Sequence, residues 1–278
     1  MSVISYLSTS PDGLFWNSVE SPWVSSICWS PRLHLFCAIS TDWDTDPQTA
    51  LAVIQTSPEG KTWTTSTQRI ESPVDSICWS PELSKFCIMS PAADLSLLSE
   101  DGLSWTASNP ITQTPAAGGT FIGCKICWSP ELQLFCTTNQ GMETQIMTSP
   151  DGLSWTPRHT GNTSCVSVCW SSDLHMFCVV TYSHEEVGPI LTSTDGITWH
   201  TPTTPVAEFG LSLDLVRWSS GLRLFYVSGV LLAETGPNLI LLTSEDGETW
   251  KYHPKYLPEL TDLCWSPTLH TFCALVAS

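Results

Sequence analysis

Short apolar stretches rich in β-branched and aromatic residues recur along the whole chain, separated by polar turn residues. In the first complete set, strands are expected near residues 24–30, 34–40, 50–57 and 61–66. Pro, Gly, Asp and Ser bound each stretch, which is typical of short strands joined by turns. No segment sustains an apolar period of 3.6 residues, so we expect no helices.

Two signatures alternate six times along the chain. The first, S-x-D-G-x-x-W, has its turn glycines 42 to 51 residues apart, and Gly247 is 44 residues from Gly13 when counted around the two termini. The second, C-W-S-P-x-L-x-x-F-C, occurs five times, once with Ser172 in place of Pro, and a degenerate copy runs from Arg217 to Tyr226. The spacing counted around the two termini therefore equals about one repeat. This favours a closed ring over an open solenoid, which would have atypical capping repeats.

The repeats predict an all-β fold, since radially repeated units of four antiparallel strands form a β-propeller. We expect one domain over residues 1–278, a six-bladed β-propeller with four strands per blade. The last blade would take two strands from each end of the chain, so pairing of the N-terminal and C-terminal strands would close the ring. The expected blades are approximately 24–66, 74–108, 122–158, 165–202, 211–253, and 260–278 with 3–19.

The first signature is interpreted as a structural turn. Gly accepts a positive φ and Asp can bond turn amides, while the Trp three residues after the Gly can pack back over the turn. Glu59 replaces Asp in the second copy. The residues assigned to these turns are Asp12, Glu59, Asp101, Asp151, Asp195, Asp246, Gly13, Gly60, Gly102, Gly152, Gly196 and Gly247.

The second signature predicts a β-hairpin. If residues 31–34 form the turn, then Ser30 faces Leu35, Trp29 faces Phe36 and Cys28 faces Cys37. The Trp–Phe pair then lies on one face of the sheet and the Cys–Cys pair on the other. The degenerate copy changes both cysteine positions together, to Arg217 and Tyr226.

The S-x-D-G-x-x-W motif resembles the Asp-box (BNR) repeat of sialidase-like propellers, and the resemblance covers the whole chain. In that family the Asp-box is a structural turn remote from catalysis. Together with W-S-P-x-L-x-x-F, it is also similar to repeat propellers of large DNA viruses and microbes. Sialidases use three arginines and a Tyr–Glu pair, and the five arginines here do not assemble a triad. The resemblance therefore implies the fold without catalysis, and we expect the chain not to be an enzyme.

The chain is acidic, with ten Lys and Arg against 27 Asp and Glu and a net charge of −17. This charge disfavours nucleic acids and anionic membrane surfaces as partners. No apolar run approaches the roughly 18 residues of a membrane helix, and the N-terminus does not resemble a secretory signal. A cytoplasmic location is therefore expected, or secretion if the cysteines prove to be disulfide-bonded.

Twelve cysteines leave three interpretations open. Free Cys packs as a small hydrophobe, so buried thiols between blades are favoured. Cross-strand disulfides would need an oxidising compartment and often strain directly opposed strands. The C-x8-C spacing is not a zinc-ribbon pattern, so we expect no metal site and no cofactor.

Strand order separates the connections onto two faces of the disc. The four strands of each blade are labelled A to D in chain order. The A–B turns (W-S-P-x-L) and the C–D turns (D-G) lie on one face of the disc, the turn face. The variable B–C and D–A loops lie on the other face, the loop face. Function concentrates on variable loops of a rigid scaffold, so the loop face is expected to bind a protein partner, with a carbohydrate-binding lectin as the alternative. The D-x-D-x-D spacing also suits calcium, although Pro47 stands where that loop needs Gly. The candidate binding residues are Trp43, Asp42, Asp44, Asp46, Glu185 and Glu186.

Overall fold

The computed structural model describes most of the chain, in thirteen segments. These are residues 5–9, 17–21, 24–42, 51–90, 95–108, 125–139, 144–160, 164–182, 190–202, 211–233, 236–253, 260–266 and 271–276. Within these segments every regular element is a β-strand and there is no helix, as the sequence predicts.

The described strands form four sheets of four strands, one of three and two of two, and all neighbours pair antiparallel. The two-stranded sheets are β1 (Ser5–Thr9) with β2 (Asn17–Ser21), and β22 (Leu260–Ser266) with β23 (Thr271–Val276). The larger sheets are β3 (Ser26–Ser30), β4 (Leu35–Asp42), β5 (Leu51–Ser57) and β6 (Thr64–Thr65); β7 (Ser76–Ser80), β8 (Lys85–Ser90), β9 (Leu95–Ser99) and β10 (Thr106–Ala107); β11 (Ile126–Ser129), β12 (Leu134–Thr138), β13 (Thr144–Ser149) and β14 (Thr156–Thr160); β15 (Ser164–Ser171), β16 (Met176–Tyr182) and β17 (Ile190–Ser193); and β18 (Leu211–Ser219), β19 (Leu224–Ala233), β20 (Gly236–Ser244) and β21 (Lys251–His253).

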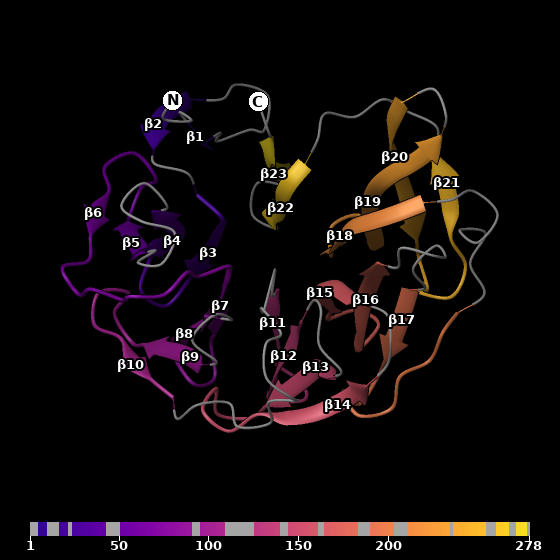
Figure 1. The fold of residues 1–278 in the computed structure, drawn as a ribbon, viewed down its shortest axis with the longest axis horizontal. Coiled ribbons are helices and arrows are strands. Elements are labelled where there is room, and N and C mark those ends of the chain that lie inside the picture. The colour runs from indigo at the N-terminus through magenta and orange to yellow at the C-terminus, as the bar shows by residue number, and fades with distance from the viewer. Residues whose placement is uncertain are drawn as a thin grey trace.

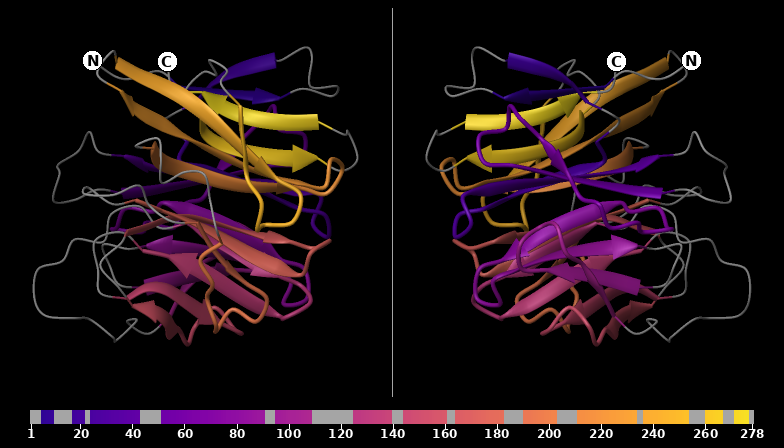
Figure 2. Two further views of the ribbon diagram at one scale, coloured as in Figure 1. Left: turned by 90° about the vertical axis from the view of Figure 1, so that its right-hand side faces the viewer. Right: turned by 90° about the vertical axis from the view of Figure 1, so that its left-hand side faces the viewer.

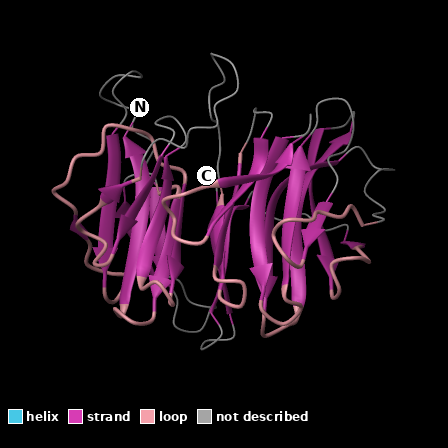
Figure 3. Cartoon of the chain, turned by 90° about the horizontal axis from the view of Figure 1, so that it is seen from below, coloured by secondary structure: helices cyan, strands magenta, loops and turns pink. Residues whose placement is uncertain are grey.

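The sheets are arranged around a central axis, and the innermost strands are β3, β7, β11, β15, β18 and β22 (Figure 1). Along the ring β3 contacts β7, β7 contacts β11, β11 contacts β15, β15 contacts β18 and β18 contacts β22. Seen from the side, the strands run between the two faces of a disc (Figures 2 and 3). This radial arrangement of antiparallel sheets is a β-propeller.

The two ends of the chain lie on the same side of the ring (Figure 1). Strand β1 is close to β23, but the pairs among the described strands keep β1–β2 and β22–β23 as separate sheets. The expected pairing between the chain ends is therefore not seen in the described part of the chain.

The predicted hairpin register is confirmed at every copy. Cys28 pairs with Cys37, Trp29 with Phe36 and Ser30 with Leu35, and Arg217 pairs with Tyr226 in the degenerate copy. The same pairs recur in the other hairpins. The Trp and Phe rings touch, with centroids 4.4 to 4.7 Å apart in the five described pairs, so the aromatic pair stabilises each hairpin.

Each of the five A–B turns that the structure describes ends in a residue with left-handed backbone. At Gln133 φ is 49°, and the preceding Ser129 Oγ accepts a hydrogen bond of 3.1 Å from the Leu132 amide. The serine thus satisfies a turn amide that would otherwise face solvent. The other turn residues with positive φ are His34, Ser84, His175 and Arg223.

Candidate functional site

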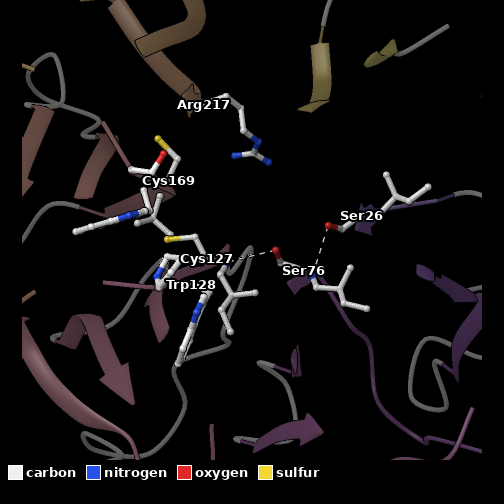
Figure 4. Close-up of a pocket in the computed structure, with 13 residues that line it drawn as sticks. Ser26, Ser76, Cys127, Trp128, Cys169 and Arg217 are labelled. Carbon is white, nitrogen blue, oxygen red and sulfur yellow. Dashed lines mark hydrogen bonds between the residues drawn. The ribbon is translucent and has the colours of Figure 1, made fainter. Parts of the chain in front are cut away.

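A pocket of about 330 Å³ lies at the centre of the ring, between the innermost strands of five sheets. Ser26 of β3 and Ser76 of β7 line one side, while Cys127, Cys169 and Arg217 line the other (Figure 4). Trp128, Trp170, Pro130 and Ser172 also line it. Since Pro130 and Ser172 belong to A–B turns, the pocket extends to the turn face and not only toward the variable loops.

The repeat explains how the serines are held at the pocket wall. Ser26 Oγ accepts a hydrogen bond of 3.4 Å from the Ile77 amide, and Ser76 Oγ accepts one of 3.2 Å from the Ile126 amide. Each hydroxyl therefore joins an innermost strand to the next blade. A serine that accepts from protein retains its own O–H as a donor for a ligand.

Arg217 breaks the repeat, because the other five copies carry Cys at this position. Its Nη1 donates to Ser167 Oγ at 3.3 Å and to the Val216 carbonyl at 2.8 Å. The guanidinium points toward the middle of the pocket (Figure 4). Burial raises the pKa of Cys169 to about 12, and the positive charge of Arg217 opposes that rise.

The pocket wall combines atoms of two tryptophans with serine hydroxyls and one guanidinium. Trp128 is 7% exposed and Trp170 is half-buried, and their rings also pack on Phe135 and Phe177. Such a mixture of apolar surface with a few polar groups is typical of small-molecule sites.

A repeated hydrogen bond from an indole to a carboxylate joins the innermost strand of one sheet to the A–B turn of the preceding sheet. Trp128 Nε1 donates to Glu82 Oε2 at 2.6 Å, and two further copies follow it around the ring. They are Trp170 to Glu131 at 2.8 Å and Trp218 to Asp173 at 3.0 Å. Sequence reasoning missed these carboxylates, although the x of S-P-x-L is acidic in three consecutive copies.

The first boundary departs from that pattern. Arg32 occupies the position of the carboxylate, and Trp79 Nε1 is buried without a hydrogen-bond partner. At the described boundaries, an acidic residue at this turn position accompanies a satisfied indole, and Arg32 accompanies an unsatisfied one.

The D-G turns form the same set of hydrogen bonds in each described Asp copy. Asp195 Oδ1 accepts from the amides of Ile197 and Thr198 at 2.7 Å each and from the Ser193 hydroxyl at 3.0 Å. The amide bonds, that from Thr198 first, lower the pKa of Asp195 to about 2. Asp101, Asp151 and Asp246 accept equivalent bonds, and Glu59 bonds the Thr62 amide.

The D-G glycines pack against the preceding sheet. At Gly152 φ is +74°, and a Cβ there would lie 2.8 Å from Leu98 Cδ2 and 3.5 Å from Cys87 Sγ. The Trp of the same motif folds back over the turn, with Trp105 Nε1 donating to the Gly102 carbonyl at 3.3 Å. Gly60, Gly196 and Gly247 also have positive φ, while Asp12 and Gly13 lie outside the described residues.

The predicted loop-face residues are not brought together by the described structure. Asp42 ends β4, where its backbone pairs with Leu51. Its side chain is not described, and Trp43, Asp44, Asp46, Glu185 and Glu186 lie outside the described residues.

The nine cysteines whose side chains are described are free thiols. Burial raises the pKa of each of them, as at Cys37 and Cys78. The described residues contain no group of three or more His, Cys, Asp or Glu arranged to hold a metal ion. They also contain no helix long and apolar enough to cross a membrane.

The sequence matches no known protein-family model and no curated protein. Among solved structures, the chain is similar to a GH74 enzyme from Niastella koreensis, with a TM-score of 0.65 and 18% identity over 85% of this chain and 39% of that one. It is similar to a protein from Lactobacillus plantarum, with a TM-score of 0.62 and 11% identity over 91% of this chain and 79% of that one. A proposed 6-phosphogluconolactonase from Bacteroides uniformis has a TM-score of 0.59 and 13% identity over 93% of this chain and 79% of that one. This chain spans less than half the length of the GH74 enzyme.

These comparisons support a β-propeller and correct one expectation. We expected the chain not to be an enzyme. That expectation is wrong, because the structural neighbours with this fold include a glycoside hydrolase and a proposed lactonase. The missing arginine triad argued against one reaction only. At these identities the likeness shows the fold alone, so neither activity is carried over to this chain.

Proposed function

We propose that the protein is a six-bladed β-propeller over residues 1–278 that binds a carbohydrate in the pocket on its axis. Six alternations of the two signatures support the blade count. The closeness of β1 to β23 supports closure of the ring by the chain ends. The D-G turn hydrogen bonds support the proposed kinship with Asp-box propellers.

The observation that carries the carbohydrate proposal is the pairing of Trp128 and Trp170 with Arg217 and serine hydroxyls in one pocket. Sugar rings present C–H faces that pack on indoles and hydroxyls that bond to guanidinium and serine groups. The volume of about 330 Å³ falls within the range of ligand pockets. The GH74 enzyme among the propeller neighbours is consistent with this choice.

A glycan array with the purified protein tests the proposal. The pocket variant is Arg217→Cys, which installs the residue of the other five copies and so preserves the hairpin. The matched control is Arg223→Ala, which removes an equal charge from an exposed turn outside the pocket lining. We expect a defined glycan to bind the wild type and the control and to lose at least tenfold in affinity for Arg217→Cys. A blank array, or equal binding by all three proteins, would refute the proposal.

The protein-partner hypothesis for the loop face stays a prediction. The same array in the presence and absence of calcium tests instead whether the loop face holds a glycan, at the candidate residues Trp43, Asp42, Asp44, Asp46, Glu185 and Glu186. Binding that depends on calcium would locate the ligand on the loops and not in the axial pocket.

A further inference from the structure

The boundary between the β3–β6 sheet and the β7–β10 sheet holds an unsatisfied donor and, on the preceding A–B turn, a positive charge. Trp79 is 9% exposed, and its Nε1 is buried without a partner. At the next three boundaries the equivalent indoles donate to Glu82, Glu131 and Asp173. A buried donor left unpaired costs roughly 1–3 kcal/mol, so this position favours any acceptor that can reach it.

Arg32 occupies the turn position from which the acceptor comes at those boundaries. Its side chain is exposed, and its Nη1 donates to Ser84 Oγ. Ser84 belongs to the A–B turn that joins Trp79 to its hairpin partner Phe86. The guanidinium therefore crosses the boundary to the turn of the hairpin whose first strand, β7, carries the unsatisfied indole.

We propose that this notch, formed by Arg32, Trp79 and Ser84, binds a carboxylate that does not come from the turn itself. One carboxylate oxygen would accept from Trp79 Nε1 in the way that Glu82 accepts from Trp128, and the other would accept from Arg32. The exposed Arg32 side chain must turn aside from Ser84 to admit the ligand. Charge-assisted bonds to guanidinium are among the strongest hydrogen bonds in proteins.

The remainder of the surface makes this notch selective. The net charge of −17 repels anions from the chain in general. A carboxylate therefore needs a local cation and an oriented donor, and Arg32 with Trp79 supplies both. The ligand can be a small organic acid or an acidic side chain of another protein, since both present the same group.

The test is a titration followed by the indole N–H resonances of the 14 tryptophans. The Trp79 signal is assigned from the Trp79→Phe variant. One arm uses sodium acetate, and the other uses a short glutamate-rich peptide, each against sodium chloride at equal ionic strength. We expect the Trp79 signal to move in the acetate arm, the peptide arm or both, and the arm that saturates at the lower concentration identifies the source of the carboxylate.

Two variants decide the outcome. Arg32→Glu supplies the carboxylate from the turn, so its Trp79 signal should already be shifted and should no longer respond. Glu82→Arg recreates the notch one boundary further on, so the Trp128 signal should become responsive. No Trp79 shift in either arm, or an undiminished shift in Arg32→Glu, would overturn the proposal. If Glu82→Arg fails to fold, the Arg32→Glu comparison still decides.

Discussion

The indole nitrogen of Trp128 donates a hydrogen bond of 2.6 Å to the carboxylate of Glu82, which stands on the A–B turn of the preceding sheet. The bond joins two blades at the turn face, in addition to the bond between their innermost strands from the Ile126 amide to Ser76 Oγ. Its repetition at Trp170 and Trp218 makes the turn position a determinant of how blades associate.

Loss of that carboxylate should destabilise the protein according to how far the indole is buried. Glu82→Ala is expected to lower the free energy of unfolding by about 1–2 kcal/mol, because it leaves a largely buried donor unpaired. Glu131→Ala should cost less than about 1 kcal/mol, since Trp170 is more exposed and water can replace the acceptor. Urea denaturation measures both. Glu82→Gln is the control, because its amide oxygen can still accept; an equal loss for Gln and Ala would contradict the account.

The D-G glycine should resist substitution. Gly152→Ala places a side chain at φ +74° and 2.8 Å from Leu98 Cδ2, so a loss of about 2 kcal/mol is expected from left-handed strain and overpacking. The neighbouring Leu153, 42% exposed, serves as the control, and Leu153→Ala should stay within about 0.5 kcal/mol. Thermal unfolding of the two variants makes the comparison, and a tolerated Gly152→Ala would show that this turn does not pack as described.

The opposite response is expected at the A–B turn. Gln133 has φ 49°, so Gln133→Gly should remove backbone strain. Gly also raises the entropy of the unfolded chain, which offsets part of this gain, and the free energy of unfolding should rise by about 0.5 kcal/mol. Gln133→Val should lower it by about 1 kcal/mol or more, because a β-branched residue tolerates this backbone poorly. The denaturant midpoints of the two variants and the wild type test this order, in which Gln133→Gly is the most stable protein and Gln133→Val the least.

The D-G aspartates should make the fold sensitive to acid. The pKa of Asp195 is about 2 in the folded protein, against about 3.9 in an unfolded chain. The unfolded state therefore binds protons first, so this contribution to stability is fully present above a pH of about 4 and is lost as the pH falls through about 2. Asp195→Asn should flatten the pH dependence of the unfolding midpoint in that window, and an unchanged slope would contradict the assignment.

The thiols should be free and slow to react. Burial raises their pKa, so little thiolate forms at neutral pH. Iodoacetamide should label the native protein slowly, with the less buried Cys28 and Cys127 first. Without reductant but under denaturing conditions, mass spectrometry should find the nine described thiols modified. Protected pairs such as Cys37 with Cys28 would instead establish cross-strand disulfides.

The sequence predicts the hairpins well because each is a local unit repeated six times. Trp29 opposite Phe36 and Cys28 opposite Cys37 follow from one turn length, and Arg217 changes together with Tyr226. The bond from Trp128 to Glu82 could not be predicted in this way, because it joins residues 46 positions apart on different blades. The x of S-P-x-L resembles any variable surface position until the neighbouring indole is placed beside it.

The candidate site shows the same limit. Variable loops directed attention to Trp43 and the nearby acids, whereas the described pocket is built from framework residues such as Trp170 and Ser76. Arg217 carried the one local signal, since it interrupts a cysteine repeat on an innermost strand. The sequence pattern could not show that Arg217 lines a pocket, because the pocket forms only where five strands from different sheets meet at one axis.

The most direct test of the central claim is a crystal structure of the protein with the glycan that binds best on the array. Electron density for a sugar ring is expected in the axial pocket, against Trp128 or Trp170 and within hydrogen-bond distance of Arg217. Density for the glycan at the loop face, with the axial pocket holding only solvent, would contradict it.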